Sequence, residues 1–249
     1  MKNIVLIPVR LASTRLPGKA LLKISGKPCL QILIERIQTV ENLDDIMVCT
    51  TENKTDDPLI EFLQGIKIKS FRGNEKDILI RLKNAVEFLD VDNIIIIDGD
   101  DIFCEPDFIR KTILELEKND SDCIKWFNLP FGTTPFGVKK NVLEKICKIK
   151  KTDDTETGWI RFFTDLDLFR VKKITSDNME LQKPEIRLSL DYEEDFQLFK
   201  DLVYTLPAKF TLNDILDLFL SENEHFKVNS NLKQKYWDNF KKNSGKLTI

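Results

Sequence analysis

Short apolar segments alternate with amphipathic stretches along the first half of the chain. Four apolar segments predict strands at residues 4–9, 45–49, 66–71 and 93–97. Between and after them, apolar residues recur at helical spacing and predict helices over residues 28–39, 58–63, 77–89 and 107–116. Because strands and helices alternate with short connections, the pattern predicts an α/β fold with a mainly parallel central sheet covered on both faces.

The second half is less regular. A turn-rich break at residues 131–137 precedes a predicted helix at 141–147 and a polar loop at 151–157. A strand at 186–190, helices at 193–203 and 212–220, and a Lys- and Asn-rich tail with partial mobility are expected to follow. No repeat or linker divides the chain, so we expect one domain over residues 1–249.

Composition narrows the possible functions. The chain has 38 Lys and Arg against 41 Asp and Glu, a net charge of −3, which argues against a nucleic-acid partner. Its apolar runs are too short for a membrane span, and its first apolar stretch is too short for a signal peptide. Because its five cysteines are also scattered, we expect a cytoplasmic protein with reduced thiols. The single histidine, His225, is expected at the surface, so carboxylates, Lys, Arg and backbone amides must perform any chemistry.

The first candidate site is the loop after the first predicted strand, residues 8–19. It combines small residues with Arg10, Arg15 and Lys19. Small residues let backbone amides approach an anion, and arginine and lysine match phosphate oxygens, so the loop suits a triphosphate. The sequence matches neither the P-loop nor the dinucleotide glycine motif. The alternative, a solvated basic loop, is disfavoured by three cations so close to a strand end.

Acidic residues follow the fourth predicted strand, in the segment 98–101. Carboxylates beyond a buried strand are unfavourable unless a cation or a donor offsets them, and Mg²⁺ prefers such oxygen ligands. Asp100 is the preferred ligand, and it shares a face with Asp98. The alternative is a capping cluster without metal. Asp191 either caps the following helix or joins Asp100 on the metal, and the spacing leaves both open.

These segments carry a resemblance to a known family. The stretch IPVRLASTRLPGKALL over residues 7–22, with Gly26-Lys27-Pro28 and Glu35-Arg36, resembles the opening of the CMP-sugar synthetases, the cytidylyltransferases. Residues 71–81, Gly99-Asp100, Leu190-Asp191 with Asp195, residues 210–215 and Asn229 resemble the spore-coat polysaccharide subgroup, and Kdo cytidylyltransferases are also similar. The resemblance implies a Rossmann-like nucleotide-diphospho-sugar transferase fold with a small dimerisation and acceptor subdomain. Its parts would be a nucleotide-binding half (1–120), an acceptor and dimerisation region (121–186), and a closing strand with C-terminal helices (187–249).

The resemblance also implies roles for individual residues. Nucleotide contacts are expected from Pro8, Arg10, Leu11, Ala12, Ser13, Arg15, Lys19, Thr50, Asp77, Arg81 and Asp98. Arg15, Lys19 and Asp100 would be catalytic, with Mg²⁺ on Asp100 and Asp191. Acceptor contacts are expected from Glu156, Trp159, Arg161 and Arg187. The alternative for Trp159, among apolar neighbours, is a place in the core or in a subunit interface.

The activity implied is Mg²⁺-dependent transfer of CMP from CTP to an acidic sugar, Kdo- or nonulosonate-like, with release of pyrophosphate, for surface polysaccharide synthesis. A homodimer formed through residues 125–185 is expected. The sequence departs from the spore-coat pattern at residues 101–102, 135–137 and 156–159, mainly on the acceptor side. Two alternatives therefore stay open: a phosphorylated polyol, aminoalcohol phosphate or phosphonate as acceptor, and a non-catalytic nucleotide-binding scaffold.

Overall fold

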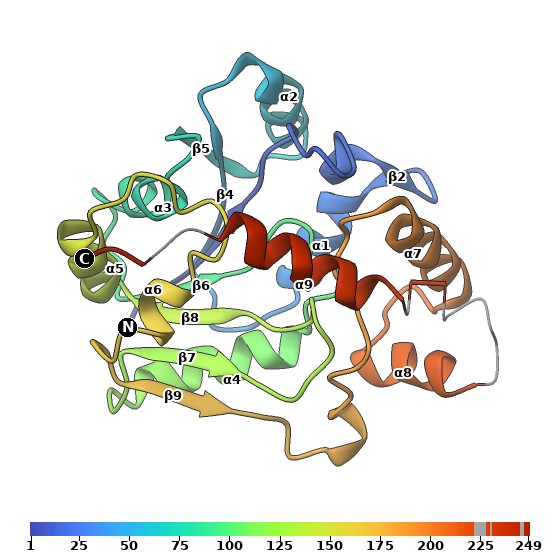
Figure 1. Ribbon diagram of the computed structural model, residues 1–249. Helices are drawn as coiled ribbons and strands as arrows, with labels where there is room; N and C mark the ends of the chain where they lie inside the picture. Colours follow the sequence, from blue (N-terminus) through green and yellow to red (C-terminus); the bar gives the residue numbers. More distant parts are fainter. Residues whose placement is uncertain (222–227, 230, 245–246) are drawn as a thin grey trace.

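A seven-stranded sheet runs through the middle of the protein in the order β5-β4-β1-β6-β8-β7-β9 (Figure 1). The strands are β1 (Asn3–Pro8), β4 (Asp45–Thr51), β5 (Lys69–Gly73), β6 (Asn93–Ile96), β7 (Cys123–Trp126), β8 (Phe136–Lys139) and β9 (Val171–Ile174). The pairs β5–β4, β4–β1, β1–β6 and β7–β9 are parallel, whereas β8 runs antiparallel to β6 and β7. The mainly parallel sheet predicted from the sequence is therefore confirmed in this computed structural model, which describes residues 1–221, 228–229, 231–244 and 247–249.

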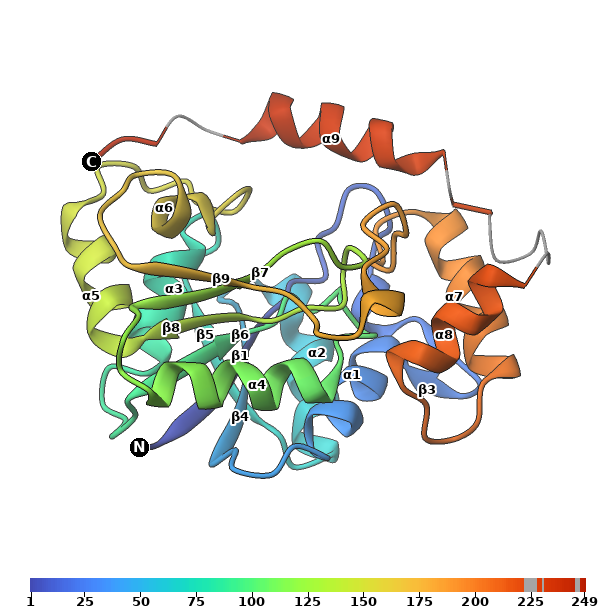
Figure 2. The ribbon, with the colours of Figure 1, turned by 90° about the horizontal axis from the view of Figure 1, so that it is seen from below.

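Helices cover both faces of the sheet. The helices of the described residues are α1 (Cys29–Ile37), α2 (Asp57–Gly65), α3 (Ile78–Ala85), α4 (Pro106–Glu117), α5 (Lys140–Ile149), α6 (Arg161–Thr164), α7 (Glu193–Thr205), α8 (Leu212–Leu220) and α9 (Leu232–Asn243). Smaller elements are the hairpin β2 (Lys23–Ile24) and β3 (Lys27–Pro28) and the single turns η1 (Lys19–Leu21), η2 (Lys54–Asp56) and η3 (Met179–Leu181). Figure 2 shows α4 on one side of the sheet and α3, α5 and α6 on the other.

Two apolar cores result from the alternation of side chains along the strands. In β1, Val5 and Ile7 pack into the core shared with α1, α2 and α4, and Ile4 and Leu6 into the core shared with α3 and α5. Every residue of β1 is buried, which explains its continuously apolar sequence. Among the described residues, no helix is long and apolar enough to cross a membrane.

Several predicted elements differ from the structure. The strand predicted at residues 186–190 is wrong: only one bridge forms, between Phe131 and Arg187, because Leu190 N turns away to donate to Asp100 O at 2.9 Å. The fifth strand starts later than predicted, since Lys67 adopts a left-handed φ of 58° after α2. The predicted elements do not include β7, β8 and β9, each of which is four residues long. The tail contains the helix α9, and His225 lies outside the described residues.

Candidate active site

A cavity of about 1030 Å³ opens where β1 and β6 end. Its lining includes the loop after β1 and residues 98–101. The loop between β7 and β8, the segment 184–191 and helix α9 also contribute to it. The cavity thus lies at the carboxyl ends of parallel strands, the place where α/β sheets bind ligands.

Most of the predicted site residues line this cavity. They are Pro8, Arg10, Ser13, Arg15, Lys19, Arg81, Asp98, Asp100, Glu156, Trp159, Arg187 and Asp191. The predicted residues outside the lining are Leu11, Ala12, Thr50, Asp77 and Arg161. The structure therefore brings together the loop after β1, the acidic segment after β6 and the segment around Asp191, although these are far apart in sequence.

Some of the residues outside the lining hold the walls in place. The buried carboxylate of Asp56 accepts from Leu11 N at 2.8 Å and from the Thr50 hydroxyl at 2.8 Å, so it ties the loop after β1 to the end of β4. Asp77 caps α3 by accepting from Ile80 N at 3.2 Å. Sequence reasoning missed Asp56, because nothing local marks a carboxylate that bonds to a loop 45 residues earlier.

Three cationic and two acidic side chains form the phosphate side of the cavity. Lys19 Nζ lies 2.6 Å from Asp100 Oδ2 and 3.0 Å from Asp191 Oδ1. Arg15 pairs with the same Asp191 oxygen, and Arg187 Nη2 lies 2.6 Å from Asp191 Oδ2. Burial favours the neutral acid, but Lys19, Arg15 and Arg187 outweigh it and hold the pKa of Asp191 well below its usual range. Asp191 is therefore ionised, and both of its carboxylate oxygens pair with cationic side chains.

The sequence left open whether Asp191 caps the following helix, and the structure shows that Asp195 caps it instead. Its Oδ2 accepts from Asp191 N at 2.9 Å and from Tyr192 N at 3.0 Å, so Asp195 satisfies the backbone at the start of α7. Asn229 Nδ2 donates to its other oxygen at 2.8 Å. The side chain of Asp191 is thereby released from capping and faces the cations of the cavity.

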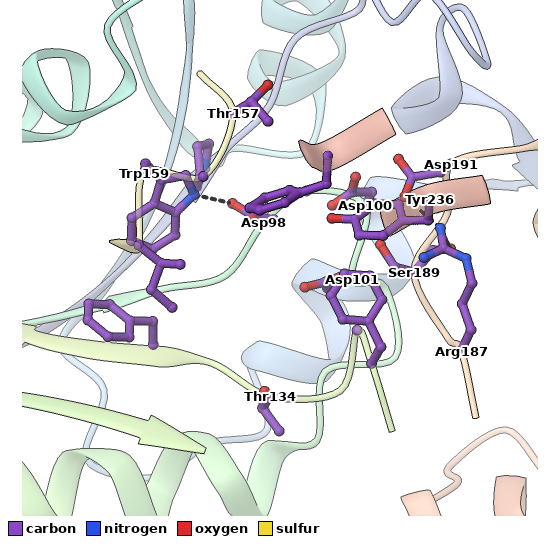
Figure 3. Close-up of a pocket in the computed structure, with 18 of the residues that line it drawn as sticks. Asp98, Asp100, Asp101, Thr134, Thr157, Trp159, Arg187, Ser189, Asp191 and Tyr236 are labelled. Carbon is purple, nitrogen blue, oxygen red and sulfur yellow. Dashed lines mark hydrogen bonds and ion pairs between the residues drawn. The ribbon is translucent and has the colours of Figure 1, made fainter. Parts of the chain in front are cut away.

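Three carboxylates crowd together after β6. Oxygens of Asp98, Asp100 and Asp101 all lie within 4.8 Å of one another (Figure 3). Burial, then the neighbouring Asp100, raises the pKa of Asp98 to about 7, and the same causes raise that of Asp101. Gly99 is required between them, because a Cβ there would lie 2.7 Å from Cβ of Val9. Such a cluster gains from a bound cation, which would offset the like charges.

Two of the predicted acceptor residues, Glu156 and Trp159, lie against the loop after β1 and the acidic segment after β6. Glu156 Oε1 lies 3.2 Å from Arg10 Nε, and its Oε2 lies 3.1 Å from Arg81 Nη2. Trp159 Nε1 donates to Asp98 Oδ1 at 3.3 Å, while its ring packs edge-on against Phe136 at 5.6 Å. Trp159 thus combines a core position with a polar contact in the cavity.

Sequence reasoning missed the contribution of α9. Lys233, Tyr236, Trp237, Asn239 and Phe240 of this helix line the cavity. The available signal was that Phe240 follows Trp237 by three residues and Tyr236 by four within a polar tail, spacings that bring the rings together on one side of a helix. The polar composition around these rings favoured a mobile tail instead.

Comparisons with known proteins identify the family. Residues 4–234 match the family model described as Cytidylyltransferase. An uncharacterized protein of Methanocaldococcus jannaschii is 34% identical over 94% of this chain and 97% of its own length. The spore coat polysaccharide biosynthesis protein SpsF of Bacillus subtilis is 28% identical over 79% of this chain and 84% of its own. The 3-deoxy-manno-octulosonate cytidylyltransferase of Geobacter metallireducens is 32% identical over 47% of this chain and 45% of its own.

Solved structures share the fold. A cytidylyltransferase from Leptospira borgpetersenii superimposes with a TM-score of 0.82 at 22% identity, over 91% of this chain and 96% of its own. A CMP:2-keto-3-deoxy-manno-octonic acid synthetase, solved in complex with CTP, superimposes with a TM-score of 0.64 at 16% identity, over 82% and 99%. The resemblance seen in the sequence is confirmed, and the chain belongs to the cytidylyltransferase family of CTP-dependent nucleotidyltransferases.

Proposed function

We propose that this protein transfers CMP from CTP, with Mg²⁺, to an acidic sugar of the Kdo or nonulosonate type and releases pyrophosphate. The names of its relatives support a sugar acceptor and a role in polysaccharide synthesis. The observation that carries the proposal is the meeting of Arg15, Lys19 and the acidic cluster in one cavity at the ends of β1 and β6. We also propose that it acts in the cytoplasm as a homodimer.

The carboxylate of Asp191 positions the side chains that are proposed to bind the phosphates. Asp191 pairs with Arg15 and Lys19 in the described structure, and its other oxygen lies 2.6 Å from Arg187 Nη2. A triphosphate can therefore take over Arg15 and Lys19 without leaving Asp191 unpaired. Arg10 and Ser13 lie on the same loop and would contact the remaining phosphate oxygens.

The residues present fit Mg²⁺. The ammonium group of Lys19 already lies between Asp100 and Asp191, and the raised pKa values of Asp98 and Asp101 reflect a site short of positive charge. Asp100 and Asp191 would hold the ion once Lys19 turns to the phosphates, with Asp98 or Asp101 beside them. When bound, Mg²⁺ would neutralise phosphate charge and orient the triphosphate.

In the reaction, an acceptor oxygen attacks the α-phosphorus in line. The bond from that oxygen to phosphorus forms, the bond to the β-phosphate oxygen breaks, and pyrophosphate leaves with the electron pair, while the proton of the attacking hydroxyl passes to the solvent. Arg15 and Lys19 stabilise the charge that develops on pyrophosphate. Glu156, which Arg10 and Arg81 fix in place, and Trp159, which contacts Asp98, would orient the acceptor.

A pyrophosphate-release assay tests this function. The purified protein is incubated with Mg²⁺ and each of CTP, UTP, ATP and GTP, together with Kdo, N-acetylneuraminate, glycerol phosphate or an aminoalkylphosphonate. The proposal expects release with CTP and an acidic sugar only. Release with a phosphate or phosphonate acceptor would replace the acceptor class, and CTP binding without release from any acceptor would contradict the proposed transfer.

A further inference from the structure

Helix α9 crosses the open side of the cavity, at a distance from the sheet (Figure 2). We infer that α9 is the outer wall of the active site and that Tyr236 is a positioning residue, which shields the reacting phosphate from water. The inference rests on the proposed function, because it concerns the nucleotide bound in that cavity.

The helix is anchored on segments from different parts of the chain. The ring of Tyr236 lies 5.0 Å from the ring of Phe131, in the loop between β7 and β8. Asn239 Nδ2 donates to the Tyr192 hydroxyl at 3.1 Å. Phe240, one turn after Tyr236, lies so close to Gly158 that a Cβ on that glycine would be 3.1 Å from the ring. These contacts hold α9 across the cavity rather than along one edge of it.

Tyr236 stands over the charged groups of the cavity. Its ring centre lies 4.6 Å from the guanidinium carbon of Arg187 and 5.8 Å from that of Arg15, both within cation–π range. Figure 3 shows it beside the acidic residues. Burial first, and then the nearby carboxylates, raise the pKa of the phenol well above its usual value, so the side chain stays neutral and cannot act as a base. Its contribution is a ring that holds the two arginines and covers the carboxylates.

Water is the competitor that such a wall excludes. If water attacks the α-phosphorus, a bond from the water oxygen to phosphorus forms and the bond to the β-phosphate oxygen breaks. CMP and pyrophosphate are then produced, a proton passes to the solvent, and CTP is lost without transfer. An enzyme that activates CTP before the acceptor arrives gains from a closed, apolar cover over that phosphorus.

The test compares CTP hydrolysis without acceptor in Tyr236→Ala, Tyr236→Phe and Phe240→Ala with the wild-type protein. Release of CMP and pyrophosphate is measured at saturating CTP and Mg²⁺, and CTP binding is measured by titration calorimetry. We expect Tyr236→Ala and Phe240→Ala to hydrolyse CTP about tenfold faster per bound nucleotide. Tyr236→Phe keeps the ring and should stay within about twofold of wild type. Tyr204→Ala is the matched control, because Tyr204 is 87% exposed on α7.

The possible failures are distinguishable. If Tyr236→Ala and Phe240→Ala bind CTP but hydrolyse it no faster than wild type, α9 does not shield the phosphate and the inference is overturned. If Tyr204→Ala also raises hydrolysis, the effect is not specific to α9 and the inference is again overturned. If the wild-type protein does not bind CTP, the proposed function falls, and the inference falls with it.

Discussion

The substitution Asp98→Asn should make the metal-free protein more stable than wild type at alkaline pH and should weaken its response to Mg²⁺. Asp98 lies beside Asp100 and Asp101. Burial first, and then the charge of Asp100, raises its pKa from 3.8 to about 7. Asparagine is nearly isosteric and keeps an oxygen that accepts from Trp159 Nε1. The substitution therefore removes a charge and little else.

The magnitude follows from proton linkage. A carboxyl whose folded pKa lies above its unfolded value binds more protons in the folded state, so its stabilising effect is lost as pH rises to the folded pKa. One pKa unit corresponds to about 1.36 kcal/mol, so between about pH 5 and the folded pKa of about 7 the cost to the wild type is at most about 2.7 kcal/mol. Solvent and adjustment of the cluster reduce this, and we expect about 1–2 kcal/mol.

Thermal unfolding followed by circular dichroism in EDTA measures this effect. For a chain of this length, about 1 kcal/mol shifts Tm by about 2–4 °C, so the Tm difference between Asp98→Asn and wild type should grow by about 2–8 °C from about pH 5 to about pH 8. Mg²⁺ with CTP should raise the Tm of the variant less than that of wild type, because one carboxylate beside the proposed metal ligands is lost. Asp90→Asn, which alters a 92% exposed side chain paired with Lys2, is the control. A Tm difference independent of pH would refute the reasoning.

Three further substitutions test other parts of the structure. Arg15→Ala should lower the rate of pyrophosphate release about 100-fold or more with little change in Tm, since Asp191 keeps other partners; half of the wild-type rate would contradict a role on the phosphates. Asp195→Asn should cost about 3 kcal/mol in urea unfolding, because its fully buried carboxylate pairs with Arg187; a change under about 1 kcal/mol would show that the network adjusts. Gly132→Ala should cost about 2–4 kcal/mol by the same measurement, because φ is +90° and the new Cβ would lie 2.5 Å from the carbonyl oxygen of Leu188. Gly65→Ala is the control, since a Cβ there has open space and should change the stability little.

The nucleotide side of the site could be predicted because its signals are local. The loop 8–19 and the acidic segment 98–101 each follow a buried strand directly, and parallel strands place their carboxyl ends at one edge of the sheet. Asp191 was also found, although the strand predicted before it does not form. Its position is set by a backbone bond to Asp100 rather than by a ladder.

The rest depends on contacts between segments distant in sequence. Asp56 fixes the loop after β1 only because β4 lies next to β1 in the sheet. Tyr236 meets Phe131 and Arg187 across the cavity, and its polar neighbours along the chain resemble those of a mobile tail. Tertiary packing decides such positions, and one sequence shows only the local pattern.

Thermal stabilisation by nucleotides tests the central claim most directly. The Tm of the wild-type protein is measured with CTP, UTP, ATP and GTP, each with and without Mg²⁺, and again for Arg15→Ala. At about 100 times Kd a ligand that binds only the folded protein adds about 2.7 kcal/mol, which is several degrees here. We expect this shift for wild type with CTP and Mg²⁺ and its loss in Arg15→Ala. A larger shift with another nucleotide, or no shift with any of them, would contradict a CTP site at residues 8–19.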